Sequence, residues 1–460
     1  MLGSLQLELM KLQLVEEEEV SMNINKLFEL AKNNNIEALE LDVNKSTSFS
    51  VSLFRGEIDN YELSTVGKIL ARGIYQNKLG FCATEKDDKS TPSFIINSIK
   101  DSALLIEKKE IPEIFKGSEK YSKKNMFSKS LESTTAEEKI DLLRKLYNYT
   151  KTLDPRISEV EVSYNESMDE RLFANSYGLK LKDKSNYFVV YCNVYVKDDN
   201  ETKDHYEYFI GNDLTKFDYM SLANKATKKA LETLHGSNVA NGTYNVVMNN
   251  DCVSSLLMAL LSNLSAEAIQ KHTSKFEGKL NTQIVSNKLT IAEKPLTNNI
   301  YRHYFDDEGV ACKNKVIINK GKLQTYFYNL ETAKKDGVES TGNAYRAGGK
   351  MSIAFSGINV KPGKLTEEQL FQKIKSGLYI TDLSGLHAGL NPNSGDFSLE
   401  SNGFKIINGK KDGPLGLFVL SGNIFELFNN VIAVGNNLTL LISSNNVPSI
   451  AFKNLKYSAE

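Results

Sequence analysis

The periodic part of the chain starts with a helical stripe and then changes to alternation. Apolar residues recur at helical spacing at Ile24, Leu27, Phe28 and Ala31. Between residues 36 and 84, apolar and polar positions alternate instead, which is typical of strands with one face in a core. The pattern therefore predicts a helix followed by an antiparallel meander of strands.

Two further helices and a connection are predicted downstream. The apolar spacing favours a helix from Phe94 to Lys108, whereas Glu110 to Ser133 has no periodicity and is expected to form a surface connection. Thr134 and Glu137 have the spacing of a capping box ahead of the next apolar stripe. We therefore expect a second long helix to start at this point.

Strands return before a last helix. Alternation predicts strands at Val160 to Tyr164 and Tyr187 to Val196, and around a turn at Tyr177-Gly178. An Ala- and Lys-rich helix from Leu222 to Leu234 is expected to close the N-terminal domain.

The chain changes character from Tyr244 onward. Glycine and asparagine interrupt it often, as in GNAYRAGG and SGNIFELFNN, which favours many short strands and ordered loops. One hairpin is predicted in detail, with a strand at residues 316–318, a turn at 319–321 and a return strand at 323–328. The pattern as a whole predicts an α+β protein with an N-terminal α/β meander domain at 22–236 and a C-terminal β-rich domain at 237–460.

Residues 1–21 differ from the remainder of the chain. Four consecutive acids, Glu16 to Glu19, precede Met22. We hypothesise that Met22 is the natural start. The alternative is that residues 1–21 form a solvated, disordered leader.

Composition excludes some classes of ligand and location. Lys plus Arg number 56 and Asp plus Glu 57, with a net charge of -1, so the basic excess expected of a nucleic-acid-binding protein is missing. No apolar run approaches the ~20 residues that span a bilayer. The cysteines are far apart and form no CxxC pair, which favours a reducing, cytoplasmic compartment; they are Cys82, Cys192, Cys252 and Cys312. We expect a soluble protein without nucleic-acid or membrane partners.

Common catalytic motifs do not occur. None of the five histidines has another within five positions, which excludes an HExxH zinc helix, and GxSxG and phosphate-loop motifs are missing too. His387 and Asp396 share a glycine-rich loop and can form an acid-base pair, or His387 can bind the backbone. Cys252 is a nucleophile near a helix start in one interpretation, and a buried structural thiol in the other, which its apolar neighbours favour.

The stretch HYFDDEGVACKN is the densest group of potential ligands. It contains His303, Asp306, Asp307, Glu308 and Cys312 within ten residues. Three adjacent acids on an extended chain point in alternating directions, and an EF-hand loop needs its acids at every second position. Spacing therefore favours a structural role, in which the acids cap the start of the hairpin at residues 316–328.

Longer motifs carry a family resemblance. FDDEGV, then NKGKLQTYFYNLETAKKDGVESTGNAYR, SGLYITDLSGLHAGLNPNSGDFSLESNGFKIINGK and LSGNIFELFNNVIAVGNN, resemble the TldD/PmbA family, once called modulators of DNA gyrase. The resemblance is close over about residues 240–452 and looser back to Met22. It implies a two-domain α+β chain that pairs with a sister chain to form a cytosolic zinc metallopeptidase acting on unfolded peptides.

The resemblance also implies where the zinc motif would lie. In the TldD branch a helix upstream of FDDEGV carries His-Glu-x-x-x-His, and the matching helix here reads LLMALLSNLSAEA. Met258 and Asn263 occupy the histidine positions and Ala259 the glutamate position. The family's third ligand, a cysteine near the C-terminal end, is missing because no cysteine follows Cys312. This is the pattern of the PmbA/TldE branch, so we expect no metal and no catalytic residue in this chain.

The resulting expectation is a non-catalytic PmbA/TldE-type subunit that shapes a peptide channel, with zinc held by a TldD-type partner. His387 and Asp396 are candidate channel residues. Two other functions stay open, namely a stand-alone peptide-binding homodimer and a self-contained hydrolase that uses His387 and Asp396.

Overall fold

The computed structural model describes residues 22–107, 113–347 and 350–459. Contacts divide the chain into two compact units, and the proposed leader at residues 1–21 lies outside the described residues. The first unit comprises the described residues up to 45, 66–116 and 171–182. The second comprises 46–65, 117–170 and 183–460.

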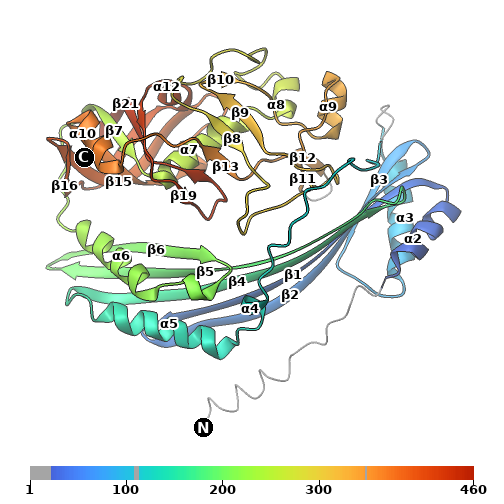
Figure 1. The fold of residues 1–460 in the computed structure, drawn as a ribbon, viewed down its shortest axis with the longest axis horizontal. Coiled ribbons are helices and arrows are strands. Elements are labelled where there is room, and N and C mark those ends of the chain that lie inside the picture. The colour runs from blue at the N-terminus through green and yellow to red at the C-terminus, as the bar shows by residue number, and fades with distance from the viewer. Residues whose placement is uncertain (1–21, 108–112, 348–349, 460) are drawn as a thin grey trace, which may run out of the picture. The chain divides into compact units, whose positions relative to one another are not determined.

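Six strands form the long N-terminal sheet, in the order β3-β2-β1-β4-β5-β6 (Figure 1). The strands are β1 (Ile36–Phe54), β2 (Glu57–Tyr75), β3 (Lys78–Thr84), β4 (Ile157–Asn175), β5 (Lys180–Asp198) and β6 (Glu201–Gly211). The meander predicted for residues 36–84 is confirmed. The sequence pattern missed β6, because its polar residues outnumber its apolar ones and hide the alternation.

Helices α2 (Ile24–Asn33) and α3 (Thr91–Leu104) supply the apolar side of the first unit. Helix α3 starts three residues before the predicted Phe94, because Pro92 suits its first turn, and it ends four residues before the predicted Lys108. The core is completed by buried residues of the sheet and both helices, among them Leu27, Leu39, Leu41, Ile69, Ile95 and Ile99.

A buried ion pair crosses this part of the sheet. The Arg72 guanidinium donates from Nε to Oε1 of Glu40 over 2.8 Å and from Nη2 to Oε2 over 3.0 Å. The side chains are 9% and 0% exposed. A bidentate pair of this kind satisfies two charges that would be costly to bury separately.

In the second unit, α5 (Ala136–Lys151) and α6 (Tyr219–Glu232) cover one face of β4, β5 and β6 (Figure 1). The capping box of α5 consists of Thr135 and Glu138, one residue later than predicted. Thr134 does not cap this helix, and its hydroxyl instead donates to the carbonyl of Ser130 in the short helix α4 (Lys129–Glu132). This helix lies within the predicted surface connection.

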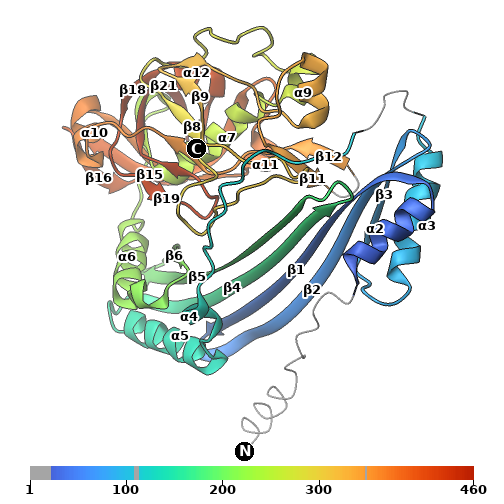
Figure 2. The same cartoon turned by 45° about the vertical axis from the view of Figure 1, so that its right-hand side comes forward.

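The C-terminal residues form two larger sheets around helix α7 (Asn250–Ser262), seen in Figure 2. The first runs β14-β7-β21-β17-β15-β16, and pairing of β14 with β15 closes five of these strands into a ring, with β18 attached to β21. Its strands are β7 (Gly242–Met248), β14 (Gly377–Ser384), β15 (Asp396–Ile407), β16 (Lys410–Pro414), β17 (Phe418–Asn423), β18 (Val431–Val434) and β21 (Ile450–Ser458).

The second C-terminal sheet has the order β10-β9-β8-β13-β20-β19. It comprises β8 (Ile291–Glu293), β9 (Lys315–Asn319), β10 (Lys322–Leu323), β13 (Ile358–Val360), β19 (Thr439–Leu440) and β20 (Asn446–Val447). A separate hairpin pairs β11 (Ala344–Ala347) with β12 (Lys350–Ile353). The remaining helices are α8 (Ala266–Gln270), α9 (Leu330–Asp336), α10 (Glu367–Ile374), α11 (Leu386–Gly389) and α12 (Ile424–Asn429), and a 3-10 turn spans Leu214–Lys216.

The hairpin at β9 and β10 is partly as predicted. Its turn is confirmed, with Gly321 at φ 80°, where a side chain would also clash with the carbonyl of Val285. The return strand, however, ends at Leu323 instead of Tyr328. The chain leaves the hairpin because Phe327 is buried in the core and exchanges backbone hydrogen bonds with Leu264 and Ala266.

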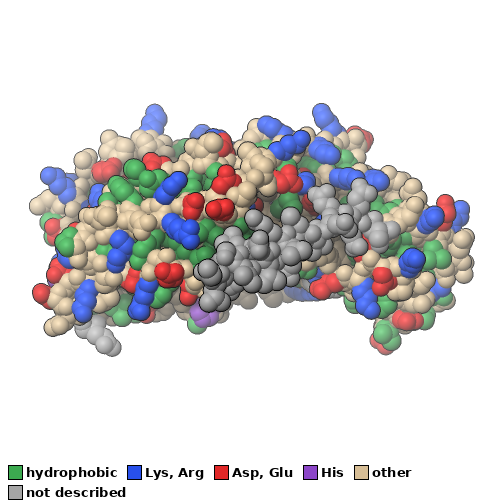
Figure 3. Space-filling view, turned by 90° about the horizontal axis from the view of Figure 1, so that it is seen from below, with side chains coloured by type: hydrophobic (Ala, Val, Ile, Leu, Met, Phe, Trp, Pro, Cys, Tyr) green, Lys and Arg blue, Asp and Glu red, His purple; other side chains and the backbone are tan. Residues whose placement is uncertain are grey.

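Charged side chains of both signs are interspersed on the face shown in Figure 3, in line with the net charge of -1. Among the described residues, no helix combines the length and apolarity needed to cross a bilayer.

The buried ion pair between Arg72 and Glu40 should contribute more to the free energy of unfolding than an exposed ion pair does. We expect Arg72→Met to lower the free energy of unfolding by about 3–5 kcal/mol, because it strands the Glu40 carboxylate without its counter-charge. Arg144→Met is the matched control, since Arg144 and its partner Asp141 are 54% and 53% exposed, and it should cost less than ~0.5 kcal/mol. Urea unfolding followed by far-UV circular dichroism measures both, and equal costs would show that the buried pair adds nothing specific.

Candidate functional site

Helix α7 is held in place by the packing of its apolar side chains in the core. Asn249 caps its start by accepting a hydrogen bond from the Cys252 N–H over 2.9 Å. Its buried residues join the C-terminal core, and they are Cys252, Val253, Ser254, Leu256, Leu257, Leu260 and Leu261. Burial is the main reason why the pKa of the Cys252 thiol lies well above its usual range, and the thiolate form is therefore disfavoured. The interpretation of Cys252 as a buried structural thiol is confirmed.

The three positions that the resemblance assigns to a zinc motif lie in the last part of this helix and at the residue just beyond it. Met258 and Ala259 are half-buried, and Asn263 is 3% exposed. The Asn263 amide donates to the carbonyl of Ala259 over 3.2 Å and to that of Pro392 over 2.9 Å. Asn263 therefore ends α7 and ties it to the loop after α11.

These residues do not fit a zinc ion. Thioether, methyl and amide groups are not among the ligands that zinc sites use, and alanine has no group that can take a proton. The Asn263 amide is, moreover, already occupied by two carbonyls. Across the described ranges, no group of three His, Cys, Asp or Glu side chains lies close enough to hold a metal ion.

His387 and Asp396 do not form the acid-base pair considered above. His387 is exposed in the short helix α11, and Asp396 is exposed at the start of β15. The Asp396 carboxylate accepts a hydrogen bond from the Asn423 amide over 2.8 Å, and this bond, with one to Ser394, lowers the pKa of Asp396. In the described part of the chain no hydrogen bond joins His387 to Asp396. Their place in a peptide channel stays a prediction.

The acids of the FDDEGV stretch bind separate backbone groups. Asp306 accepts hydrogen bonds from the N–H groups of Glu308 (3.0 Å), Val310 (2.9 Å) and Ala344 (2.9 Å). It thereby closes its own turn and holds the first residue of β11.

The neighbouring acids continue this arrangement. Asp307 accepts from the Arg346 N–H over 2.7 Å, and Glu308 from the N–H of Leu330, the first residue of α9, over 2.8 Å. The prediction that the acids cap the β9-β10 hairpin is wrong, because they bind β11 and α9 instead. Their structural role is confirmed, because their carboxylates accept hydrogen bonds from the backbone of two other segments, β11 and α9.

Burial sets the protonation of Asp306. Removal from water, above all, and the nearby Glu308 carboxylate raise the pKa of Asp306 to about 7, and the three N–H donors oppose the rise. Asp306 is 5% exposed. Its change of charge near neutral pH thus takes place inside the fold.

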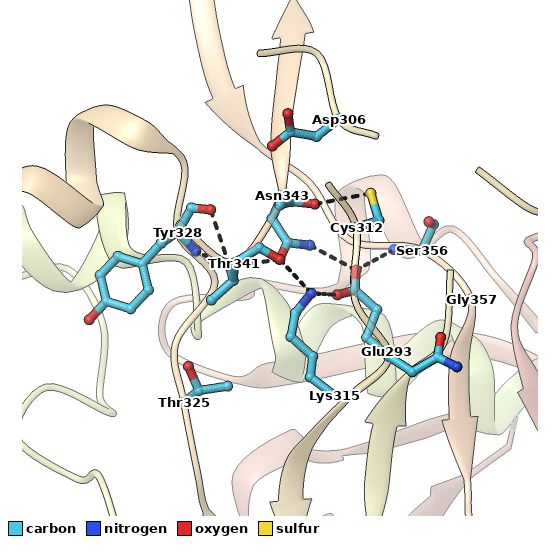
Figure 4. Close-up of polar contacts among 12 residues, drawn as sticks. Glu293, Asp306, Cys312, Lys315, Thr325, Tyr328, Thr341, Asn343, Ser356 and Gly357 are labelled. Carbon is cyan, nitrogen blue, oxygen red and sulfur yellow. Dashed lines mark hydrogen bonds and ion pairs between the residues drawn. The ribbon is translucent and has the colours of Figure 1, made fainter. Parts of the chain in front are cut away.

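A buried polar cluster that was not predicted lies around Glu293 (Figure 4). Glu293 accepts from the Asn343 amide over 2.8 Å and from the Ser356 N–H over 3.1 Å, and it pairs with Lys315 at 2.5 Å. Lys315 also donates to the carbonyl of Thr341 over 2.7 Å. Asn343 belongs to the GNAYR stretch, whose composition predicts an ordered loop. No local pattern predicts a role for Glu293 or Lys315. Because these partners occupy Glu293, the cluster is a structural hub that joins four segments.

Comparison with known proteins places the chain in a family. Residues 129–234 match the model of the PmbA/TldA metallopeptidase central domain, and residues 241–459 match that of the PmbA/TldA metallopeptidase C-terminal domain. The chain belongs to the PmbA/TldD metallopeptidase family.

Relatives and solved structures agree with this assignment. The chain is 25% identical over 407 residues to Metalloprotease PmbA of Escherichia coli O157:H7, covering 87% of each chain. A putative modulator of a DNA gyrase from Thermotoga maritima has a TM-score of 0.87 at 25% identity, covering 94% of this chain and 99% of that one. TldE from Thermococcus kodakarensis has a TM-score of 0.87 at 22% identity, covering 95% and 100%. The α+β fold expected from the resemblance is confirmed.

The protonation of Asp306 gives a pH-dependent prediction. A folded pKa of about 7, above the unfolded value of about 3.9, means that stability falls as pH rises from about 4 to 7. Asp306→Asn removes the acceptor for the Ala344 N–H and should cost about 1–3 kcal/mol at pH 5, and less at pH 8, where the wild-type carboxyl is ionised. Urea unfolding at both pH values measures this.

The control for this experiment is Glu339→Gln, whose side chain is 94% exposed and should show no such trend. A cost of Asp306→Asn that grows with pH would mean instead that the three N–H donors hold Asp306 ionised.

Restoring the zinc motif should not create a metal site. In the variant M258H/A259E/N263H, the Ala259 and Pro392 carbonyls lose the Asn263 amide, at roughly 1–3 kcal/mol for each polar group left without a partner. A third ligand is still missing. We expect less than about 0.1 zinc per chain by elemental analysis after dialysis, for this variant and the wild type. Stoichiometric zinc in the variant would show that its pocket and supporting shell are already in place.

Proposed function

We propose that this chain is the non-catalytic, TldE-type subunit of a TldD/TldE zinc metallopeptidase complex that processes or degrades unfolded peptides in the cytoplasm. The observation that carries the proposal is the occupation of the motif positions by Met258, Ala259 and Asn263. None of the three side chains suits zinc or proton transfer. Zinc and its chemistry are assigned to a TldD-type partner.

The fold around positions 258, 259 and 263 is well packed, which supports a structural role for this chain in the proposed complex. Helix α7 is packed and capped, and Asn263 secures its end through two hydrogen bonds. The helix therefore serves as structure at the place where the catalytic branch carries its ligands. A chain that keeps the family's architecture and lacks its donors is suited to forming one wall of a peptide channel.

The contacts of Asp396 argue against a self-contained hydrolase. Its carboxylate is engaged by Asn423, and its pKa is lowered, which makes it a weak base. The four cysteines are buried, so none is placed as an exposed nucleophile.

Reconstitution tests the proposal. Alone, the chain should not cleave an unfolded peptide such as reduced, carboxymethylated casein. Mixed with a TldD-type chain from the same genome, it should give chelator-sensitive cleavage that neither chain gives separately. Replacing the partner's motif glutamate by glutamine should abolish turnover, whereas His387→Ala with Asp396→Ala here should change KM more than kcat, because these residues are assigned to substrate handling.

Three outcomes would contradict the proposal. Chelator-resistant cleavage by this chain alone would identify a self-contained hydrolase. A stable homodimer that binds peptides and ignores the TldD-type chain would identify a stand-alone binding protein. Loss of kcat in the His387 and Asp396 variant, with complex and zinc intact, would move these two residues into the mechanism.

A further inference from the structure

The two faces of β5 and β6 differ in composition. One face of β5 is buried against α5 and α6, through Phe188, Val190, Cys192, Val194 and Val196. Residues between these on β5, and their partners on β6, occupy the opposite face, because Tyr191 pairs with Tyr208 and Asn193 with Tyr206. We call this the tyrosine face, and it consists of Tyr187, Tyr191, Tyr195, Tyr206 and Tyr208.

The tyrosine face is covered at one end and accessible at the other. The Tyr187 ring lies 6.1 Å from that of Tyr301, and Tyr208 Oη accepts a hydrogen bond from the Ile442 N–H over 3.2 Å. Tyr206 is 56% exposed, and its ring centroid lies 6.3 Å from that of the half-buried Tyr191. All these residues belong to the second unit. A large aromatic side chain is thus left in solvent beside a packed aromatic group.

Small polar residues continue this face onto the neighbouring strands. On β4, Val160, Val162 and Tyr164 are buried, so Ser163 and Asn165 point to the opposite side, and Asn165 accepts a hydrogen bond from Ser50 over 2.8 Å. Tyrosine combined with serine and asparagine is the composition of antibody binding loops, where rigid rings supply contact area and small polar groups adapt their hydrogen bonds.

Acidic side chains surround the tyrosines. Asp204 is the strand partner of Tyr195 on β6, and Glu161 lies on β4 between the buried Val160 and Val162, so both acids lie on the tyrosine face. Asp251 and Asp382 act on Tyr206, whose pKa is raised first by partial removal from water and then by these two carboxylates. Within the described ranges, none of these four acids forms an ion pair with a lysine, arginine or histidine. Such acids leave a local negative potential that a cationic ligand would neutralise.

Asp251 shows the same crowding of negative charge. Asp251 is exposed, and partial removal from water, together with Glu207 and Asp382, raises its pKa, whereas Lys229 opposes the rise. Lys229 itself is paired with Glu207. The lysine that acts on Asp251 is thus already paired with another carboxylate.

We propose that the tyrosine face binds an extended peptide segment rich in lysine and arginine. Ammonium or guanidinium groups would lie over the Tyr206 and Tyr191 rings and pair with the surrounding carboxylates. The inference rests on the proposed function, in which this chain handles peptides without cleaving them, and it names the class of peptide. A second copy of the chain fits less well, because its own acids would meet those of the first.

Peptide binding to the isolated full chain tests the inference. The probes are two fluorescein-labelled, unstructured 12-residue peptides, one alternating Lys and Ser and the other alternating Glu and Ser, measured by anisotropy. We expect the Lys peptide to bind at least about ten-fold more tightly, and its affinity to fall as salt rises, because exposed charges are screened. The double variants Tyr191→Ser with Tyr206→Ser and Asp251→Asn with Asp382→Asn should each weaken binding by about five-fold or more.

Matched controls use exposed residues elsewhere. Tyr345 on β11 is 51% exposed, and the Glu339 side chain is 94% exposed, so Tyr345→Ser and Glu339→Gln should leave the affinity unchanged. Circular dichroism of every variant establishes that the fold is retained.

Several results would overturn the inference. These are equal affinity for the two peptides, no binding of the Lys peptide, or unchanged binding in the tyrosine variant. If sedimentation shows that the tyrosine variant turns a dimer into a monomer, the face is an interface between copies instead. If the mixture with the TldD-type chain cleaves peptides but the isolated chain does not bind the Lys peptide, the proposed function stands and this inference fails. If the isolated chain binds the Lys peptide but the mixture does not cleave peptides, this inference stands and the proposed function fails.

Discussion

The C-terminal part of the molecule depends on one side of helix α7. Leu256, Leu257, Leu260 and Leu261 are at most 1% exposed, and Leu264 just beyond the helix is fully buried. Burial of each such side chain contributes roughly 1.5–3 kcal/mol, as an upper estimate. This packing fixes the rotation of the helix, and Met258 and Ala259 pack against the border of the same core. The apolar packing alone accounts for how this helix is held.

Periodicity predicted the helices and strands well where one face of the element is apolar and the other is polar. The long strands β1, β4 and β5 and the helices α2, α5 and α6 all carry a clear apolar side, and each was found from its pattern. The predicted start of α5 was wrong by one residue, because two neighbouring threonines fit the capping pattern equally well. Thr134 and Thr135 each have an acid three residues on; in the structure Thr135 caps α5, and the Thr134 hydroxyl donates to Ser130.

The polar network could not be predicted for a different reason. Asp306 and Ala344 are 38 positions apart, and Glu293 and Asn343 are 50 apart, so no local spacing connects them. Sequence spacing indicated that the three adjacent acids would not gather around one ion, but it could not supply their partners, and Asp306 and Asp307 both bind β11. The resemblance located positions 258, 259 and 263 on a helix, and only the coordinates showed that Asn263 bonds to Pro392.

The four longest strands also have a consequence for folding. Each of β1, β2, β4 and β5 has 19 residues and passes from one compact unit into the other. Because these strands carry their backbone ladders from residues of one unit to residues of the other, breaking hydrogen bonds in one part of a strand disturbs its neighbours in the same sheet. The N-terminal sheet should accordingly melt as one cooperative block, and trimming the chain at residue 45 or 116 would leave unpaired strand edges that invite aggregation.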